Sequence, residues 1–402
     1  MTQIEIKRRE TNTDASDYGS RIPDADEFGR TCQPNRSKCK GHVGTCGIEG
    51  VFKRNFPSPS RTGAARLALA STILAINLRA QTVSYNVRVT NGYTDLFDWP
   101  ATVQALAPPN SLASRHEIGQ IYNITGDSTV ISALVERALR ENKLIFAEKN
   151  RIVRICEVGA VGAPPNFGAY PFSLIRASEA HKLTRGGGVP VAFIDTGADY
   201  LHPELNGKFW VNAAEDKNAN GVVDSLDFDG RDDDGNGYAD DVIGYDFVHQ
   251  PRSLGGGDYL FADPDPGDDN THGTMVSGLA LWVMPEIRVM VVRAFAAGGG
   301  GEDDDIARAL VYAADNGARV INCSFGDIYP SLTMRSAVEY ALSRGVVVVA
   351  SAGQTTGDKP HYPSDFLGVV SVSATGQTDS GDEYFLPLSN FGPRVALAAP
   401  GA

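Results

Sequence analysis

Cysteine is scarce in this sequence of 402 residues. There are five cysteines, an odd number, and three of them, Cys32, Cys39 and Cys46, lie in a polar stretch near the N-terminus. Together with His42 these three could in principle hold a metal ion, but their spacing matches no familiar zinc pattern. We therefore expect neither a disulfide framework nor a metal site built from cysteine.

An excess of positive charge is also absent. The chain carries 36 Lys and Arg residues against 49 Asp and Glu residues, a net charge of −13, which argues against a nucleic-acid partner. Many of the acidic residues are concentrated between residues 215 and 241, where only Lys217 and Arg231 oppose them. Carboxylates this close together repel one another unless water or cations neutralise them.

Long hydrophobic runs are missing as well. The apolar segment LALASTILAINL, residues 67–78, is too short to cross a bilayer, so we expect no membrane span. It follows a basic stretch, residues 52–66, and precedes the small residue Ala80, which is the order of a secretory signal. We predict a signal peptide at residues 51–80 and a secreted or otherwise extracytoplasmic protein. The alternative is a buried amphipathic helix in a longer propeptide.

The position of this signal is unusual, because a signal peptide normally begins a protein. Here residues 1–50 precede it, and they are polar, rich in glycine and without apolar periodicity. Such a composition cannot bury enough apolar surface to fold. We interpret residues 1–50 as a disordered extension or as sequence that is not translated.

Residues 81–160 carry the pattern of a small α+β domain. Alternating and helical apolar spacings predict a strand at 83–89, a helix at 127–142 capped by Asp127 or Ser128, and two strands around a turn at 144–155. The segment GAVGAPPNFGAYP, residues 159–171, differs in composition and indicates a linker to the rest of the chain.

Residues 165–402 form a second domain in which apolar strands alternate with helices. Strands are predicted at 188–195, 287–295, 318–326, 346–353 and 369–375, and helices at 271–283, 302–317 and 333–345. The helix at 271–283 is expected to be buried. This alternation predicts the α/β class, with a mostly parallel sheet and helices on both of its faces.

Two candidate catalytic residues lie at the ends of these elements. Asp195 ends the strand at 188–195, and catalytic groups in parallel sheets gather at the carboxyl ends of strands. His272 lies at the start of the helix at 271–283, where Gly273 and Gly278 allow close approach of other backbone. Each residue alone is compatible with a purely structural role.

Four segments taken together resemble the subtilisin-like serine protease family. In chain order they are VAFIDTGADYLHPEL (191–205), DDNTHGTMVSG (268–278), VINCSFG (320–326) and VVVVASAG (346–353). The resemblance extends from about residue 172 to the end of the chain. It places the acid before the base, the order that this family uses.

The resemblance implies a role for each matching residue. Asp195 would orient and polarise the ring of His272, which would take the proton from a nucleophilic serine. The triplet Ser324, Phe325 and Gly326 matches the strand that pairs with the substrate backbone. Phe325 would then flank the side-chain pocket; the alternative is an ordinary core residue.

One departure from the family pattern concerns the oxyanion site. The family places an asparagine directly after the Ala-Gly of VVVVASAG, and this chain has Gln354 there. Glutamine keeps the amide donor but displaces it by about 1.5 Å if the backbone is unchanged. Because losing such a donor typically lowers the rate by a factor on the order of 10²–10³, we expect impaired rather than abolished stabilisation of the oxyanion.

A second departure concerns the nucleophile. The family places a Gly-Thr-Ser-x-Ala-x-Pro segment, with the catalytic serine and a central helix, shortly after an Ala-Pro-Gly corner like residues 399–401. The 402 residues contain no Gly-Thr-Ser and end just after this corner. We therefore expect a truncated or interrupted gene and an incomplete catalytic domain. Such a chain would be inactive as given and poorly stable unless another chain fills the gap.

An acidic insertion at residues 212–247 lies between the two catalytic candidates. It repeats Asp-x-Asn/Asp-x-Asn-Gly, and oxygen ligands two residues apart suit a hard divalent cation. Similar insertions bind calcium in many secreted members of the family, so the resemblance implies Ca²⁺; the alternative is a solvated acidic loop. One candidate set is Asp216, Asn218, Asn220 and Asp224, and the other is Asp232, Asp234, Asn236 and Asp241.

The segment IFAEKN, residues 145–150, resembles the end of the inhibitory propeptide of this family. Residues 81–160 would then be a propeptide that binds the catalytic domain as its own partner, with the processing point within residues 151–171.

Three functions remain as alternatives for the protein. The first is a secreted, calcium-dependent endopeptidase that acts on peptide or protein substrates through an Asp-His-Ser triad. The second is a non-catalytic pseudoprotease or a decayed gene fragment. The third, an acid-active sedolisin, is disfavoured because that type has Glu in place of His272.

Overall fold

The computed structural model describes residues 82–156, 170–249, 262–378 and 380–401. These residues all belong to one compact unit, residues 70–402. The extension expected at 1–50, the signal peptide expected at 51–80 and residues 159–169 of the expected linker lie outside the described residues. Within the described residues, no helix has the length and apolar character needed to cross a membrane.

Residues 82–150 form an α+β subdomain, called here the N-terminal subdomain. Its elements are β1 (Thr82–Val89), β2 (Ala101–Ala105), β3 (Ile121–Asp127), α2 (Ser128–Arg140) and β4 (Leu144–Lys149). The antiparallel sheet has the order β2-β3-β1-β4, and α2 packs Ile131, Val135 and Ala138 into the core beneath it. Asp127 caps α2, as predicted, by accepting hydrogen bonds from the amides of Thr129 and Val130.

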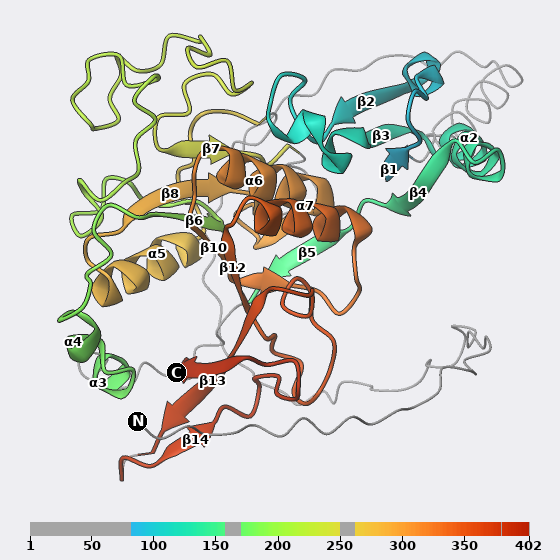
Figure 1. Ribbon diagram of the computed structural model, residues 1–402. Helices are drawn as coiled ribbons and strands as arrows, with labels where there is room; N and C mark the ends of the chain where they lie inside the picture. Colours follow the sequence, from blue (N-terminus) through green and yellow to red (C-terminus); the bar gives the residue numbers. More distant parts are fainter. Residues whose placement is uncertain (1–81, 157–169, 250–261, 379, 402) are drawn as a thin grey trace, which may run out of the picture. The chain divides into compact units, whose positions relative to one another are not determined.

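The rest of the chain is built on an eight-stranded sheet (Figure 1). The strand order is β14-β13-β12-β10-β6-β8-β7, and β15 also pairs with β13. Every pairing is parallel except that of β14 with β13. The strands are β6 (Pro190–Asp195), β7 (Gly244–Asp246), β8 (Arg288–Arg293), β10 (Val320–Cys323), β12 (Val347–Ser351), β13 (Val370–Gln377), β14 (Glu383–Phe385) and β15 (Leu397–Pro400).

Helices cover both faces of this sheet, as the alternating pattern predicted (Figure 1). The longer ones are α5 (His272–Val283), α6 (Asp303–Asp315) and α7 (Leu332–Ser343), and two short ones, α3 (Tyr170–Leu174) and α4 (Ala177–Ala180), precede β6. On β6, Ala192 and Ile194 belong to the core that contains α6 and α7, whereas Phe193 belongs to the core that contains Leu281 of α5. Successive side chains of one strand thus pack on opposite sides.

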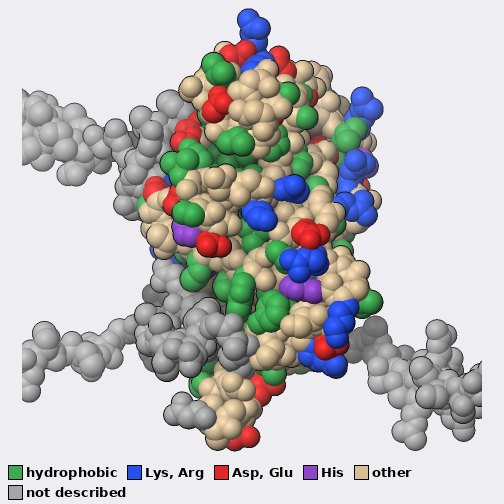
Figure 2. Space-filling view, turned by 90° about the vertical axis from the view of Figure 1, so that its left-hand side faces the viewer, with side chains coloured by type: hydrophobic (Ala, Val, Ile, Leu, Met, Phe, Trp, Pro, Cys, Tyr) green, Lys and Arg blue, Asp and Glu red, His purple; other side chains and the backbone are tan. Residues whose placement is uncertain are grey.

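The expectation that the helix at 271–283 is buried was wrong for one of its sides. Ser277 and Leu281 are buried, but Met275, Leu279 and Trp282 are 49%, 38% and 37% exposed. The apolar residues of this helix point in all directions around its axis, so the sequence pattern could not show which side packs on the sheet. Figure 2 shows one face of the molecule, on which hydrophobic side chains reach the surface among charged ones.

A three-stranded antiparallel sheet links the N-terminal subdomain to the rest of the molecule. Its central strand is β5 (Ile152–Ile155), flanked by β9 (Gly300–Glu302) and β11 (Phe325–Gly326). The two strands predicted at 144–155 are therefore present, but they do not pair with each other. β4 pairs with β1, while β5 pairs with strands more than a hundred residues away in the sequence.

Candidate active site

Asp195 and His272 lie in direct contact at the carboxyl end of β6, an interior strand of the large sheet. Asp195 is the last residue of β6 and His272 the first residue of α5, and Oδ1 of Asp195 lies 2.7 Å from Nδ1 of His272. Both side chains are buried; Asp195 is fully buried and His272 is 8% exposed. The contact holds the imidazole in one orientation and directs Nδ1 to the carboxylate.

The start of α5 is held by residues that sequence reasoning did not single out. Asp268 accepts hydrogen bonds from the amides of Asn270, Thr271 and Thr274, and it also accepts one from the hydroxyl of Thr196. Thr196 in turn accepts from the amide of Gly273 at 3.0 Å. These bonds tie the strand that carries Asp195 to the helix that carries His272. Asp268 lies in the recognised DDNTHG segment, which was the available signal.

Gly273, which directly follows His272, lies where no larger residue fits. A Cβ atom at this position would lie 2.1 Å from the carbonyl oxygen of Gly197 and 3.2 Å from the Asp195 side chain. Real Cβ atoms do not approach backbone so closely. The glycine therefore permits the short separation between β6 and α5 on which the Asp195–His272 contact depends.

The surroundings of His272 favour its protonated form. Burial alone would lower the pKa of the imidazole, but the hydrogen bond and the charge of Asp195 outweigh it, so the pKa of His272 lies above its ordinary value. A hydrogen bond to the backbone of Cys156 contributes in the same direction. Since Nδ1 is engaged by Asp195, the nitrogen that faces Cys156 is Nε2. Within the described residues, no serine hydroxyl hydrogen bonds to this ring.

The segment that ends in Cys156 runs past this pair in an extended conformation. β5 lies between β9 and β11, the amide of Ile155 donates to the carbonyl of Gly299 at 3.0 Å, and the amide of Cys156 donates to the carbonyl of Ser324 at 2.8 Å. An extended peptide bound on both sides by antiparallel strands is a common mode of peptide recognition. The chain thus presents the backbone of its own residue Cys156 to His272.

The structure brings three of the sequence-predicted residues to this segment. Ser324 supplies the carbonyl that binds Cys156, and Phe325 and Gly326 form β11, which pairs with β5. Phe325 is fully buried and packs on Phe295 with a ring distance of 4.8 Å, so it is a core residue that also forms the edge of the groove. Gln354 is exposed in the bend that follows β12.

The first candidate calcium set is assembled in one loop. Asn218 and Asn220 each donate through their amide nitrogen to Oδ2 of Asp224 at 2.8 Å. Asp216 accepts from the backbone amides of Asn220 and Gly221. The four side chains therefore surround the same turn, where their oxygens accept hydrogen bonds from amides of the loop itself.

The second candidate set lies nearby and includes a residue that sequence reasoning missed. Glu215 joins Asp232 and Asp234, and one carboxylate oxygen from each lies within 4.8 Å of the others. Asn236 donates to both Asp234 and Asp241, and Asp241 also accepts from the hydroxyl of Tyr312. Burial raises the pKa of Asp241 to about 7 and also raises that of Glu215. Oxygen donors and partly buried carboxylates of this kind fit calcium.

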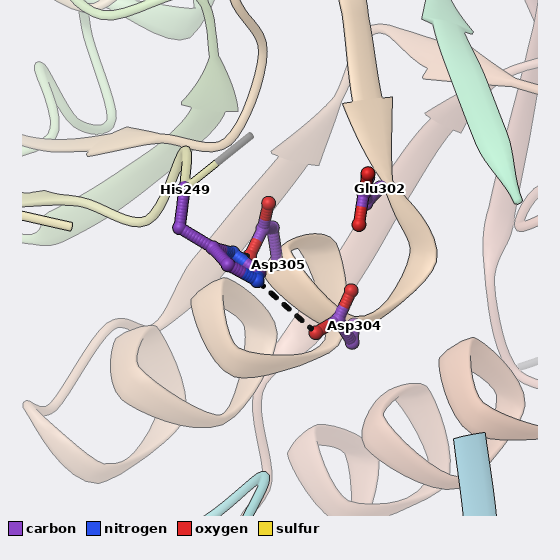
Figure 3. Close-up of side chains that lie close together, drawn as sticks. All are labelled: His249, Glu302, Asp304 and Asp305. Atoms are coloured by element: carbon purple, nitrogen blue, oxygen red, sulfur yellow. Dashed lines mark hydrogen bonds and ion pairs between the residues drawn. The ribbon is translucent and has the colours of Figure 1, made fainter. Parts of the chain in front are cut away.

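A third group of titratable residues was not predicted at all. His249, Glu302, Asp304 and Asp305 converge at the N-terminus of α6 (Figure 3). His249 is paired with Asp305, and Arg308 forms ion pairs with Asp304 at 2.9 Å and with Asp305 at 3.1 Å. Cationic groups already face the carboxylates, so this arrangement is that of a buried ion-pair network rather than of an open metal site.

Comparison with known proteins identifies the family. Residues 186–402 match the model of the Subtilase family, Peptidase S8. The chain is 34% identical over 233 residues to the thermophilic serine proteinase of Bacillus sp. (strain AK1), covering 55% of this chain and 46% of that protein. It is 28% identical over 238 residues to thermitase of Thermoactinomyces vulgaris, covering 57% of this chain and 68% of that protein. The chain thus spans about half of the length of the first of these relatives.

A solved structure agrees at the level of the fold. The crystal structure of fervidolysin from Fervidobacterium pennivorans, described as a keratinolytic enzyme related to subtilisin, superposes with a TM-score of 0.54 at 20% sequence identity. The superposition covers 80% of this chain and 47% of that one. The family model covers more than half of the chain and includes both members of the buried carboxylate–imidazole pair. This chain belongs to the subtilase family.

Proposed function

We propose that this chain carries the acid and the base of a secreted, subtilisin-like serine endopeptidase. The observation that carries the proposal is the 2.7 Å contact between Oδ1 of Asp195 and Nδ1 of His272. A serine hydroxyl is a weak nucleophile until a base removes its proton. A carboxylate on Nδ1 keeps the proton there, so that Nε2 is free to act as that base and then to return the proton to the leaving amine.

The remaining roles follow from the positions around this pair. β9 and β11 hold the substrate backbone as an added antiparallel strand, and Ser324 binds the amide of the residue before the cleaved bond. Gln354 is the side-chain donor to the oxyanion, because it takes the place of the family's asparagine, in the exposed bend directly after Gly353. Secretion is supported by the order of basic, apolar and small residues at 52–80.

The N-terminal subdomain acts in this proposal as the inhibitory propeptide. Its supports are β5, which lies as an extended strand between β9 and β11, and the His272 ring, which hydrogen bonds to the backbone of Cys156. The processing point is then the peptide bond between Cys156 and Glu157. A segment held there blocks access of other peptides until it is removed.

Calcium binds in the proposal to the acidic insertion, residues 212–247. The ion would be held by Asp216, Asn218, Asn220 and Asp224 in one site, and by Asp232, Asp234, Asn236, Asp241 and Glu215 in the other. When bound it neutralises the repulsion between these side chains and fixes the insertion on the sheet edge near β7 and β8. No catalytic step depends on it.

A non-catalytic role is the second candidate for the polypeptide of residues 1–402. These residues contain no Gly-Thr-Ser sequence, and Gln354 replaces the asparagine that the family uses. In this alternative the polypeptide keeps the groove and binds peptides without hydrolysing them. We propose that the 402 residues by themselves do not cleave peptide bonds.

Imidazole nitrogen NMR on the 402-residue chain tests the catalytic pair. We expect a strongly deshielded Nδ1 proton on His272, lost in Asp195→Asn, and a pKa of His272 above the ordinary value. A His272 signal that is unchanged in Asp195→Asn would overturn the proposal.

A fluorophosphonate probe separates the two candidate functions, because stoichiometric labelling of this chain would show an activated serine and exclude the non-catalytic role.

A further inference from the structure

The side chain of Cys156 lies against two polar side chains next to the candidate active site. Its Sγ atom lies 2.9 Å from the hydroxyl oxygen of Ser351 and 3.9 Å from Nε2 of His361. Burial raises the pKa of the thiol to about 11, so it remains a neutral thiol. We use the term Cys156 pocket for Ser351 and His361, which contact Sγ, together with Gly326 and Gly353, which lie against the His361 ring.

His361 fills the part of the pocket into which a longer side chain would extend. A Cβ atom on Gly326 would lie 2.2 Å from Cε1 of His361, and one on Gly353 would lie 2.6 Å from Cδ2 of the same ring. The imidazole therefore lies against both glycine backbones, between the end of β12 and β11. Because neither glycine has a side chain, there is room between these two strands, and the His361 ring fills it.

The ring is fixed in this position by its own contacts. His361 is 4% exposed, and its Nδ1 lies 3.1 Å from the carbonyl oxygen of Ser351, so Nδ1 carries the proton and donates it. Its backbone amide donates to Asp365 at 3.1 Å. Burial lowers the pKa of His361, which keeps the ring neutral and leaves Nε2 as an acceptor toward the Cys156 side chain.

We propose that His361 restricts this site to peptides with a small side chain, such as Cys, Ser or Ala, at the residue before the cleaved bond. The inference rests on the proposed function, because it takes residues 152–156 as bound in the manner of a substrate. A residue larger than Cys meets the imidazole, and the ring cannot withdraw without leaving Ser351 and the two glycine backbones. His361 is thus a specificity-determining residue that does not touch the reacting carbonyl.

A series of substitutions at residue 156 of the full chain tests the proposal without requiring catalysis. The readout is hydrogen exchange at the amides of Ile155 and Cys156, which are protected only while β5 lies between β9 and β11. We expect Cys156→Ala and Cys156→Ser to retain the protection of the unsubstituted chain. We expect Cys156→Leu and Cys156→Phe to reduce protection by about tenfold or more, because overfilled sites are destabilised.

The variant Cys156→Phe/His361→Gly distinguishes the ring from other causes. Removing the imidazole opens the room between the two strands, and protection should return to within about threefold of that in the unsubstituted chain, since the phenyl ring is then accommodated. Arg154→Phe is the matched control: Arg154 is exposed on β5, so its replacement should behave alike with and without His361→Gly.

Each result decides the question. Undiminished protection across the residue-156 series, or a loss in Cys156→Phe that His361→Gly does not relieve, would overturn the role of His361 and leave the proposed function intact. Rapid exchange of Ile155 and Cys156 in the unsubstituted chain would show that β5 does not stay in the groove. That outcome would overturn both this inference and the assignment of the N-terminal subdomain as an inhibitor.

Discussion

The carboxylate of Glu148 accepts two hydrogen bonds from Thr333, one from the backbone amide at 2.7 Å and one from the hydroxyl at 2.6 Å. The amide of Leu332 and the hydroxyl of Ser331 donate to the same carboxylate. Glu148 belongs to β4 of the N-terminal subdomain, whereas these donors begin α7. A negative charge at the N-terminus of a helix is favourable, and this one joins two parts of the molecule.

Glu148→Ala should weaken the attachment of the N-terminal subdomain. The substitution leaves the donors at the start of α7 without their partner, and we expect a loss of about 1–3 kcal/mol in the free energy of unfolding measured with urea. Glu141→Ala is the control, because Glu141 forms an exposed ion pair with Arg137 on α2. Equal effects of the two substitutions would contradict the role given to Glu148.

Gly273→Ala should displace His272. The added methyl group would meet the carbonyl oxygen of Gly197, so β6 and α5 must separate, and we expect a destabilisation of about 1–3 kcal/mol. The deshielded Nδ1 proton of His272 should disappear at the same time. Gly278→Ala lies on the same helix in open space and should be neutral or stabilising by up to about 1 kcal/mol. A Gly273→Ala chain with normal stability and an intact His272 signal would refute the close approach.

The Asp195–His272 pair should make stability depend on pH in a defined direction. The pKa of His272 is raised in the folded protein, so its contribution is fully present below the ordinary pKa of about 6.5. It is lost as the pH rises through the folded-state pKa. The difference in unfolding free energy between the unsubstituted chain and Asp195→Asn should therefore be larger at about pH 5.5 than at about pH 9. A difference that grows with pH would show the opposite coupling.

Removal of calcium should lower the midpoint of thermal unfolding. A ligand present at about 100 times its dissociation constant adds about 2.7 kcal/mol, which corresponds to a shift of roughly 5–10 °C in a domain of this size. Asp216→Asn and Asp232→Asn should each remove part of the shift, one for each proposed site. Asp98→Asn, an exposed acid outside the insertion, should leave it unchanged. A midpoint that is insensitive to chelator would exclude both sites.

Arg308→Met should be strongly destabilising. The substitution leaves Asp304 and Asp305 buried without the guanidinium that pairs with them, and breaking such a buried pair costs about 3–5 kcal/mol. Arg335→Met removes an exposed partner of Glu339 on α7 and should have little effect. If the two substitutions proved equally mild in urea denaturation, the pairing with His249 would be sufficient for these carboxylates and the guanidinium would not be needed.

Local sequence patterns account for most of the elements. The apolar run at 188–195 became β6, and the spacing at 127–142 became α2 with its Asp127 cap. These predictions succeed because period and capping are properties of neighbouring residues. The buried face of α5 could not be predicted, since its apolar residues point in all directions and only contacts with the sheet select one.

The sequence by itself determined that Asp195 ends a buried strand and that His272 begins a helix, because periodicity and the surrounding glycines act over a few residues. Tertiary structure alone decided that β5 leaves β4 and lies between β9 and β11, that His361 lies beside Cys156, and that Glu215 and Asp268 join groups already recognised. These contacts join residues far apart in the chain, and their free energy depends on the packing of the whole domain rather than on any local pattern.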